Sequence, residues 1–116
     1  MSVYASNIII EQGFDFSSNF ALGDSRTNSS LNITGYGVTA QLRKTYSSSS
    51  YTSFESTILD SEVGIIRISL TDEQTSSLKP GRYVFDVLIE IGGLNSGGTK
   101  YKAFEGMALV RPGVTR

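Results

Sequence analysis

The feature that most constrains the fold is the run 82–91, in which large apolar residues recur at every second position. A period of two places these side chains on one face of an extended chain, as in a β-strand. Val84 and Leu88 make the second face partly apolar, which is typical of a strand that is central to its sheet and covered on both sides. We therefore predict that this strand is the centre of the core. Its first face carries Tyr83, Phe85, Val87, Ile89 and Ile91, and its second carries Arg82, Asp86 and Glu90.

A tight turn precedes this strand. Pro80 presets φ at about −65° for the second turn position, and Gly81 accepts the positive φ that follows. The sequence therefore predicts φ > 0 at Gly81 and a fully buried Phe85. Tyr83 is expected in the core with its hydroxyl at the rim.

Shorter runs with the same period fill most of the remaining chain. In the second of them, Phe14, Phe16 and Phe20 are expected to face the core. The last run is expected to place Phe104, Ala108 and Val110 on one face, with Tyr101, Ala103, Met107 and Leu109 on the other. The predicted strands cover about 7–11, 14–22, 38–43, 54–59, 65–70, 82–91 and 100–110.

One segment has a helical signal. Thr71 can cap a helix while Gln74, three residues later, bonds back to it, and two acidic residues lie in the first turn. Pro80 limits this helix, so we expect one short helical turn near 72–78.

Together these signals predict an all-β fold: a single Ig-like antiparallel β-sandwich of about seven strands. A small β-barrel is the alternative. A chain of 116 residues forms one domain, 1–116, with short arms at 1–7 and 111–116. Leu31 and Ile33 are expected to close the sandwich edge.

Composition removes most kinds of chemistry. The chain has no His and no Cys, and its formal net charge is −1. We therefore expect no metal, no cofactor, no disulfide and no binding to nucleic acid or an anionic membrane. The longest apolar run, 8–10, is too short for a signal sequence or a membrane span, so we expect a soluble chain that is not secreted.

Acidic residues are the remaining candidates for catalysis. The near pairs are Glu11 with Asp15, Asp60 with Glu62, and Asp72 with Glu73. A glycosidase needs two carboxylates across a cleft, and a compact sandwich with short loops offers little cleft. We therefore predict no enzymatic activity, no small-molecule substrate and no catalytic residue. The loop 92–98 is glycine-rich but lacks the Lys-Ser/Thr ending of a phosphate cradle, so we expect a flexible hairpin loop.

The segment 46–53 combines two tyrosines with a run of serines. Recognition loops use this composition, because Tyr supplies contact area at low entropic cost and Ser supplies adaptable hydrogen bonds. The segment is therefore either a partner-binding loop centred on Tyr46 and Tyr51, or a solvated linker whose rings fold onto the sandwich edge.

Five segments carry a further pattern, in which glycines and turn residues introduce alternating strands. They are Gln12-Gly13-x-Asp15-Phe16, Ile33-Thr34-Gly35-Tyr36, Gly64-x-Ile66-x-Ile68, Leu78-x-Pro80-Gly81-Arg82-Tyr83 and Glu105-Gly106-Met107-Ala108-Leu109-Val110. With this pattern, from about 8 to 110, the chain resembles a family of small tailed-phage virion proteins with Ig-like folds. These proteins are common in marine and cyanobacterial phages and are similar to the N-terminal modules of baseplate upper proteins.

The resemblance implies a non-enzymatic structural or assembly role in the virion, in head decoration, neck, tail or baseplate. It also implies several copies bound to other phage virion proteins, after assembly in the host cytoplasm. We predict partner contacts at Tyr46, Tyr51, Arg111 and Arg116. The alternative function is a carbohydrate- or receptor-binding β-sandwich at the phage or cell surface, although glycan binders usually expose Trp and this chain has none.

Overall fold

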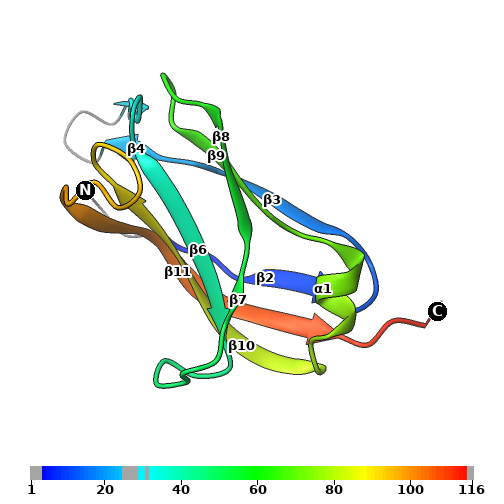
Figure 1. Cartoon of the computed structure of the whole chain (residues 1–116). Coiled ribbons are helices and arrows are strands. Elements are labelled where there is room, and N and C mark those ends of the chain that lie inside the picture. The colour runs from blue at the N-terminus through cyan, green and yellow to red at the C-terminus, as the bar shows by residue number, and fades with distance from the viewer. Residues whose placement is uncertain (1–3, 25–28, 31, 115–116) are drawn as a thin grey trace.

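The structure is a computed structural model that describes residues 4–24, 29–30 and 32–114 (Figure 1). Strands dominate it, and α1 is the only helix in the described part of the chain. The longer strands are β2 (Ile8–Glu11), β3 (Phe16–Ala21), β6 (Gly37–Arg43), β8 (Glu55–Asp60), β9 (Ile65–Leu70), β10 (Gly81–Glu90) and β11 (Lys100–Arg111). The short elements are β1 (Tyr4–Ala5), β4 (Gly23–Asp24), β5 (Ser29–Ser30), β7 (Thr52–Ser53) and α1 (Asp72–Ser76).

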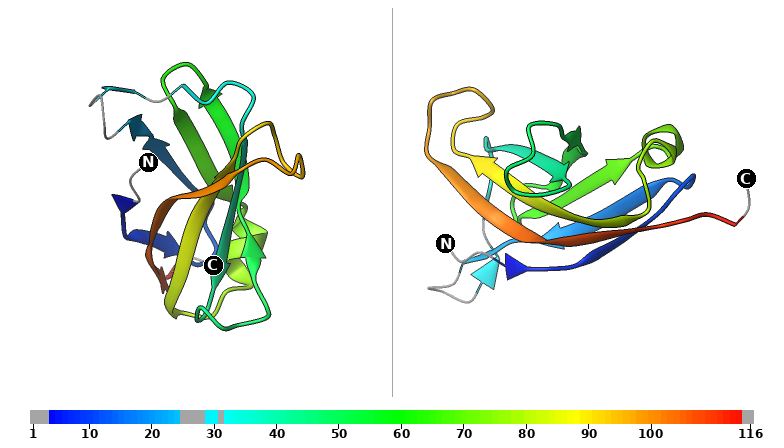
Figure 2. Two further views of the ribbon diagram at one scale, coloured as in Figure 1. Left: turned by 90° about the vertical axis from the view of Figure 1, so that its left-hand side faces the viewer. Right: turned by 90° about the horizontal axis from the view of Figure 1, so that it is seen from below.

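The strands form two main sheets, as the all-β prediction requires. One has the order β1-β11-β10-β6-β7, with β2 also paired to β11, and the other has the order β3-β9-β8 (Figures 1 and 2). A separate pair, β4-β5, lies at one end. The two sheets face each other across one core. In this core the ring centroids of Phe20 on β3 and Phe104 on β11 are 4.5 Å apart.

The strand β10 is central, as predicted. It pairs antiparallel with β11 on one side and with β6 on the other, and Phe85, Val87 and Ile89 are buried. Gly81 has the predicted positive φ, at 145°, but it is already the first residue of the strand and pairs with Val110. Ile91 was predicted on the core face, yet it lies beyond the end of β10 and is 36% exposed.

The predicted helical turn is confirmed at Asp72–Ser76. Thr71 Oγ1 accepts a hydrogen bond from the Gln74 amide, and the Gln74 side chain accepts one from the Thr71 amide. The buried hydroxyl of Thr75 donates to the carbonyl oxygen of Phe14 and accepts from the Gly13 amide. The helix therefore fixes the turn between β2 and β3.

The first two strands pair parallel with the last strand, whereas the sequence predicted a wholly antiparallel sandwich. Tyr4 pairs with Phe104, and Ile8 pairs with Ala108. Between these two ladders the Ser6 amide donates to the Glu105 carbonyl oxygen. A Cβ atom on Gly106 would lie 1.7 Å from the Ser6 carbonyl oxygen, so only glycine allows this close approach. Part of the predicted arm 1–7 is therefore strand.

Two further predicted side-chain positions, Phe14 and Ala103, are wrong because of backbone geometry. Phe14 is 46% exposed, because it lies in a turn and β3 begins only at Phe16. Ala103 is buried, because the register shifts by one residue where Val87 pairs with Phe104 and Leu88 with Lys102. Such a bulge brings neighbouring residues of one strand to the same side. The buried Ile33 agrees with its predicted place, whereas Leu31 lies outside the described residues.

Glu90, which was predicted on the second face of the strand with Arg82 and Asp86, is only 4% exposed. The loop after β10 folds back over it, and its carboxylate accepts hydrogen bonds from the Asn95 amide and the Ser96 hydroxyl. Gly37, which pairs with Glu90, makes room for this loop, since a Cβ atom there would lie 2.4 Å from the Leu94 amide nitrogen. The predicted hairpin loop 92–98 is thus present, but it is packed against the sheet.

Candidate protein-binding surface

We call the side of the larger sheet that faces away from β3-β9-β8 the outer face. Every second residue of its strands points to this side, and the cross-strand register sets which of these residues are neighbours. Three successive rows cross the sheet: Ile9, Leu109 and Arg82; Met107, Val84 and Arg43; Glu105, Asp86 and Gln41.

The edge of the outer face is apolar. Ile9, Met107 and Leu109 are 52%, 45% and 39% exposed, and the register places them side by side on β2 and β11. With Asn7 and Arg82 they surround a shallow depression of about 250 Å³. A contiguous group of exposed large apolar side chains is typical of an interaction site rather than of ordinary surface. We call these three residues the apolar patch.

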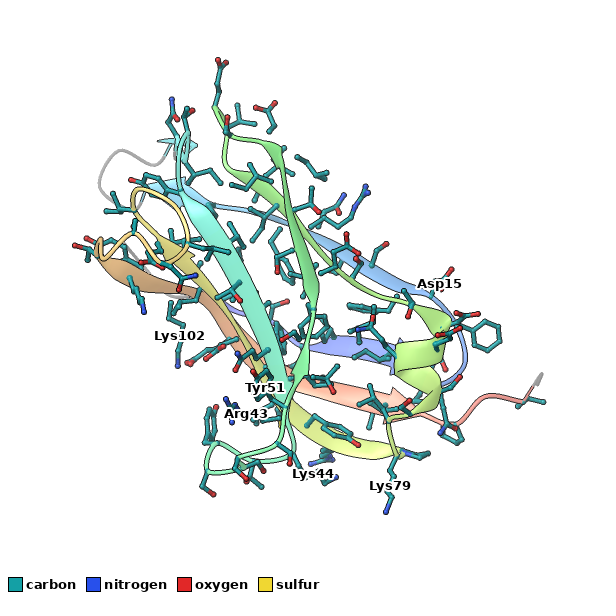
Figure 3. All side chains as sticks on the ribbon, in the orientation of Figure 1. Asp15, Arg43, Lys44, Tyr51, Lys79 and Lys102 are labelled. Carbon is teal, nitrogen blue, oxygen red and sulfur yellow. The ribbon has the colours of Figure 1, made fainter. Side chains whose placement is uncertain are left out.

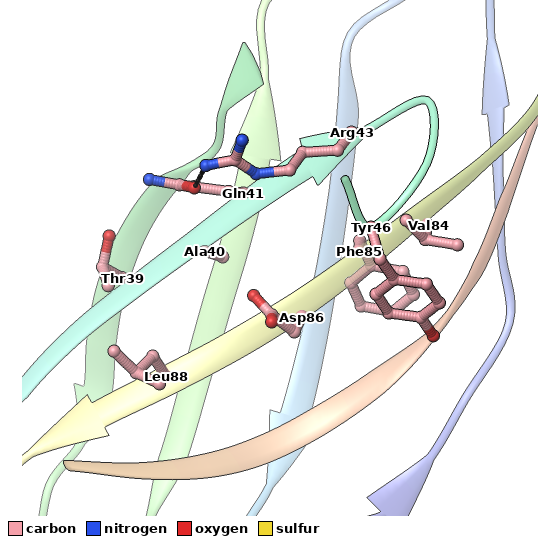
Figure 4. A pocket seen from close by; sticks show the side chains of 9 residues that line it. All are labelled: Thr39, Ala40, Gln41, Arg43, Tyr46, Val84, Phe85, Asp86 and Leu88. Carbon is pink, nitrogen blue, oxygen red and sulfur yellow. Dashed lines mark hydrogen bonds between the residues drawn. The ribbon is translucent and has the colours of Figure 1, made fainter. Parts of the chain in front are cut away.

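The centre of the outer face carries a larger cleft of about 500 Å³ (Figure 4). Its floor comes from β6 and β10, and Tyr46 from the following loop overhangs it. Tyr46 is 74% exposed, so one aromatic surface is accessible beside the polar groups of the floor. The lining residues are Thr39, Ala40, Gln41, Arg43, Tyr46, Val84, Phe85, Asp86 and Leu88.

Arg43 holds the Ser/Tyr loop in place. Its guanidinium donates hydrogen bonds to the Ser48 carbonyl oxygen and to Gln41 Oε1, the latter at 2.9 Å. It also lies 4.8 Å from the ring centroid of Tyr51, a cation–π arrangement that Figure 3 shows at the end of β6. The loop therefore presents Tyr46 from a position that is fixed at the sheet.

An ion-pair network borders the cleft, which Asp86 also lines. Lys102 Nζ lies 3.2 Å from Glu105 Oε2 and 3.8 Å from Asp86 Oδ2. The hydrogen bond to Glu105, followed by the charges of Glu105 and Asp86, raises the pKa of Lys102 above its ordinary value despite partial desolvation. These three residues give the outer face a charged stripe, which meets the cleft at Asp86.

The predicted contact residues have different positions in the structure. Tyr46 and Tyr51 are both exposed, with Tyr51 at 54%, and both lie at the loop end of the outer face. Arg111 is the last residue of β11 and forms an ion pair with Glu11 on β2, which raises the pKa of Arg111. Arg116 lies outside the described residues.

The apolar patch was not predicted as a site. The sequence placed Met107 and Leu109 together on the second face of the last strand but assigned them no role. The available signal was the second apolar stripe itself: such a face needs a second layer to cover it, and the described part of the chain has no element there. Ile9 carried a similar signal, since only alternate members of three consecutive isoleucines can point to one core.

Three carboxylates of the near acidic pairs have partners within the fold. Glu11 is bound to Arg111, and Asp15 Oδ1 accepts a 2.8 Å hydrogen bond from the Asp72 amide at the start of α1. Asp60 accepts from the Glu62 amide within its own turn. Among the described residues, no three His, Cys, Asp or Glu residues lie together as a metal site would require. The described part also has no helix that is long and apolar enough to span a membrane.

No family model and no curated protein matches this chain. Among solved structures, it is similar to a Listeria monocytogenes internalin-like protein, lmo2027, with 15% identity and a TM-score of 0.42. It is also similar to a family 123 glycoside hydrolase from Clostridium perfringens (13%, TM-score 0.42). A third structure is AggA, the major subunit of aggregative adherence fimbriae type I from Escherichia coli (12%, TM-score 0.35).

The chain covers different shares of these structures. Between 90% and 100% of this chain aligns with each of the three. It spans only 28% of the internalin-like chain and 24% of the hydrolase, but 89% of AggA. At these scores and identities, none of the three likenesses carries an argument about this protein's function.

Proposed function

We propose that the chain is an Ig-like β-sandwich. The strand order supports this, because β10 and β11, and likewise β8 and β9, form antiparallel neighbours while the connections β3 to β6 and β9 to β10 change sheet. A second support is the hydroxyl of Tyr83, near the start of β10, which donates a 2.8 Å hydrogen bond to the carbonyl oxygen of Lys79. A tyrosine that bonds back to the chain at this corner is a hallmark of Ig sandwiches.

We further propose that the protein is a non-enzymatic assembly module that binds another protein through the outer face. The apolar patch is the observation that carries this proposal. Water-exposed Ile, Met and Leu side chains gain free energy when a partner covers them, at roughly 25 cal/mol for each Å² of apolar surface removed from water. Tyr46 and Arg43 beside the patch are of the types that most often anchor interfaces. Partner specificity would come from the charged stripe, since it accepts only a complementary arrangement of charge.

The proposed setting is the virion of a tailed phage, with other virion proteins as partners in several copies. This part of the proposal is supported by the sequence motifs alone, because none of the three similar structures is named as a virion protein. Assembly would then take place in the host cytoplasm. The contacts expected at Tyr46 and Tyr51 lie next to the outer face and fit the same partner.

The test replaces apolar residues of the patch with lysine. Met107→Lys or Leu109→Lys should leave the fold intact, because both side chains are already exposed, and should abolish incorporation into purified phage particles. The matched control is Leu94→Lys, which adds the same charge at a side chain that is 53% exposed on the loop 92–98. Incorporation of all three variants at the wild-type level would refute the outer face as the interface. Absence of the wild-type protein from the particles would refute the virion setting.

The cleft supports a second candidate function, the binding of a glycan. Sugar sites combine an aromatic surface with carboxylate and amide groups that bond to hydroxyls, and here Tyr46, Asp86 and Gln41 supply these groups. Titration with neutral oligosaccharides, followed by amide chemical shifts, tests it. Shifts confined to β6, β10 and the loop after β6 that vanish in Tyr46→Ser would favour this function. No shifts at millimolar sugar would reject it.

A further inference from the structure

The strand β3 has a free edge. Among the described residues it pairs only with β9, through six consecutive positions from Phe16 opposite Leu70 to Ala21 opposite Ile65. In an Ig constant-type sandwich the corresponding sheet has a fourth strand, formed by the first segment of the chain. Here the first segments, β1 and β2, pair with β11 in the other sheet. The far side of β3 is therefore left with the donors and acceptors of an open strand.

The side chains of β3 show the same openness. Phe16 and Ser18 point toward the core but remain partly exposed, whereas Ile66 and Ile68 on the neighbouring strand β9 are fully buried. If another strand covered the free side of β3, its core-facing residues would be buried as fully as those of β9. Phe16 in particular packs on Phe54, with 6.1 Å between ring centroids, and still retains exposed surface.

The free edge also has none of the features that prevent strand pairing. Natural edge strands are protected by charged residues, proline, bulges or very short length. The sequence of β3, Phe-Ser-Ser-Asn-Phe-Ala, contains no charge and no proline, and its pairing with β9 has no register shift. The opposite edge of the same sheet, β8, carries Glu55 and Asp60 and has a register shift between Ile58 and Asp60. One edge is thus protected and the other is suited to pairing.

We propose that β3 pairs antiparallel with β3 of a second copy of this chain, so that the two three-stranded sheets form one continuous sheet. Residues opposite each other in an antiparallel pair point to the same side, so the register must match inward with inward positions. A two-fold axis at Ser18 does this. It places Phe16 opposite the partner's Phe20 on the core side and Ser17 opposite the partner's Asn19 on the outside.

A second copy fits this edge better than an arbitrary strand for two reasons. The strand has no charge, so two copies meet without like-charge repulsion. The partner's Phe20 would cover the exposed part of Phe16, and two-fold symmetry produces this apolar contact twice, once for each copy. The contact is small, so the dimer should be reversible and depend on concentration. It uses the sheet opposite the outer face, so it is independent of the proposed function and leaves the outer face accessible.

Charge placed at Ser17 gives a directional test. Asn19 accepts a 3.1 Å hydrogen bond from Arg67, so in the dimer residue 17 lies beside the partner's Asn19 and Arg67. Ser17→Lys should therefore repel the second copy, whereas Ser17→Glu should attract it. Within one copy, the residues directly across the sheet from Ser17 are Ser69 and Glu55, and the copy's own Arg67 is only a diagonal neighbour, opposite Asn19. The control Leu59→Lys adds the same charge at an exposed position on the protected edge.

The measurement is sedimentation equilibrium of the purified chain between about 1 µM and 1 mM, the range in which small interfaces dissociate. We expect a monomer–dimer equilibrium for the wild type and a dissociation constant at least about tenfold higher for Ser17→Lys. Ser17→Glu and Leu59→Lys should dimerise at least as well as the wild type. Hydrogen exchange of the wild type should also slow in β3, and not in β8, as concentration rises.

Three results would overturn the proposal. The first is a wild type that remains monomeric at the highest concentration. The second is a Ser17→Lys variant that dimerises as the wild type does. The third is equal weakening by Ser17→Lys and Leu59→Lys. Equal unfolding midpoints would show that every variant is folded when its dimerisation is measured. The hydrogen-exchange measurement uses the wild type alone, so it applies even if one variant fails to fold.

Discussion

The ring of Phe85 meets the ring of Phe54 edge-on, with 6.3 Å between the centroids and 70° between the planes. Phe85 lies on the central strand β10, and Phe54 lies where the chain passes from β7 in one sheet to β8 in the other. The contact therefore joins the two sheets at the point where one segment belongs to both. Edge-to-face pairs of this kind add about 0.5–1.5 kcal/mol to the free energy gained by burial alone.

Truncation of this ring should be among the most damaging single changes. Phe85 is 3% exposed, so Phe85→Ala removes a buried ring and leaves a cavity, which typically costs about 3–5 kcal/mol. Urea unfolding measures the change, and Phe14→Ala is the control, because Phe14 is exposed and should cost less than about 0.5 kcal/mol. A loss below about 1 kcal/mol for Phe85→Ala would mean that the core face of β10 is wrongly assigned.

Gly81→Val should destabilise through the backbone. The φ of Gly81 is 145°, a region that side-chain-bearing residues rarely adopt, and a β-branched residue resists it most. Space is not the obstacle, because an added Cβ would meet only the end of the Lys44 side chain, which can move. We expect a loss of about 1–3 kcal/mol in chemical unfolding. Stability equal to the wild type would show that β10 can begin without this conformation.

Gly106→Ala should act on the first strands. The new methyl group would collide with the Ser6 carbonyl oxygen, so β1 must move away from β11. The expected cost is about 1–3 kcal/mol, as for other overpacked sites. Hydrogen exchange gives the more specific result: the Ser6 amide, which now bonds to the Glu105 carbonyl, should lose protection while β10 retains its own. Unchanged exchange at Ser6 would contradict the close approach.

Tyr46→Ser with Tyr51→Ser should separate binding from stability. Both rings are exposed, and the loss of the cation–π contact between Arg43 and Tyr51 costs about 0.5–1 kcal/mol at an exposed site. We expect thermal unfolding close to that of the wild type and poor incorporation into particles. If a well-folded double variant is incorporated normally, the loop is not part of the interface and the apolar patch must act without it.

The ion pairs of Lys102 predict a dependence on alkaline pH. Its pKa is raised above the ordinary 10.5, so its contribution to stability is complete below pH 10.5 and is lost as pH rises through the higher, folded-state pKa. Both partners are more than one-third exposed, so the contribution is about 0.2–1 kcal/mol. The stability difference between wild type and Lys102→Met should therefore vanish above that pKa. Lys100→Met, which removes an equal charge from an exposed position, is the control.

Local signals explain which parts of the fold were predictable. The capping box of Thr71 and Gln74 needs only four residues, and the core face of β10 repeats over most of its length, so both were found from the sequence. The bulge at Ala103, the burial of Glu90 and the parallel pairing of Ile8 with Ala108 depend on segments that meet only after folding. A period-two pattern does not show which distant segments will be in contact in the folded chain.

The candidate surface, too, was predictable only in part. The exposure of Tyr46 and Tyr51 followed from their place among serines, whereas the patch of Ile9, Met107 and Leu109 required the register between two strands that are about a hundred positions apart. Exposed apolar residues on a strand have the same sequence pattern as buried ones. Only the absence of a covering layer, within the described residues, distinguishes them.

The parallel pairing of β1 and β2 with β11 also determines how the domain responds to tension. Because these strands run in the same direction, the start of β1 and the end of β11 lie toward opposite ends of the sheet (Figure 1). A pull applied at these two points loads the hydrogen bonds between the strands in shear, so that many must break together, whereas an antiparallel hairpin pulled at its open end unzips one bond at a time. Resistance to stretching is governed by the rate of unfolding. The direction of two short strands thus makes the ladder between the first and last strands a mechanical clamp.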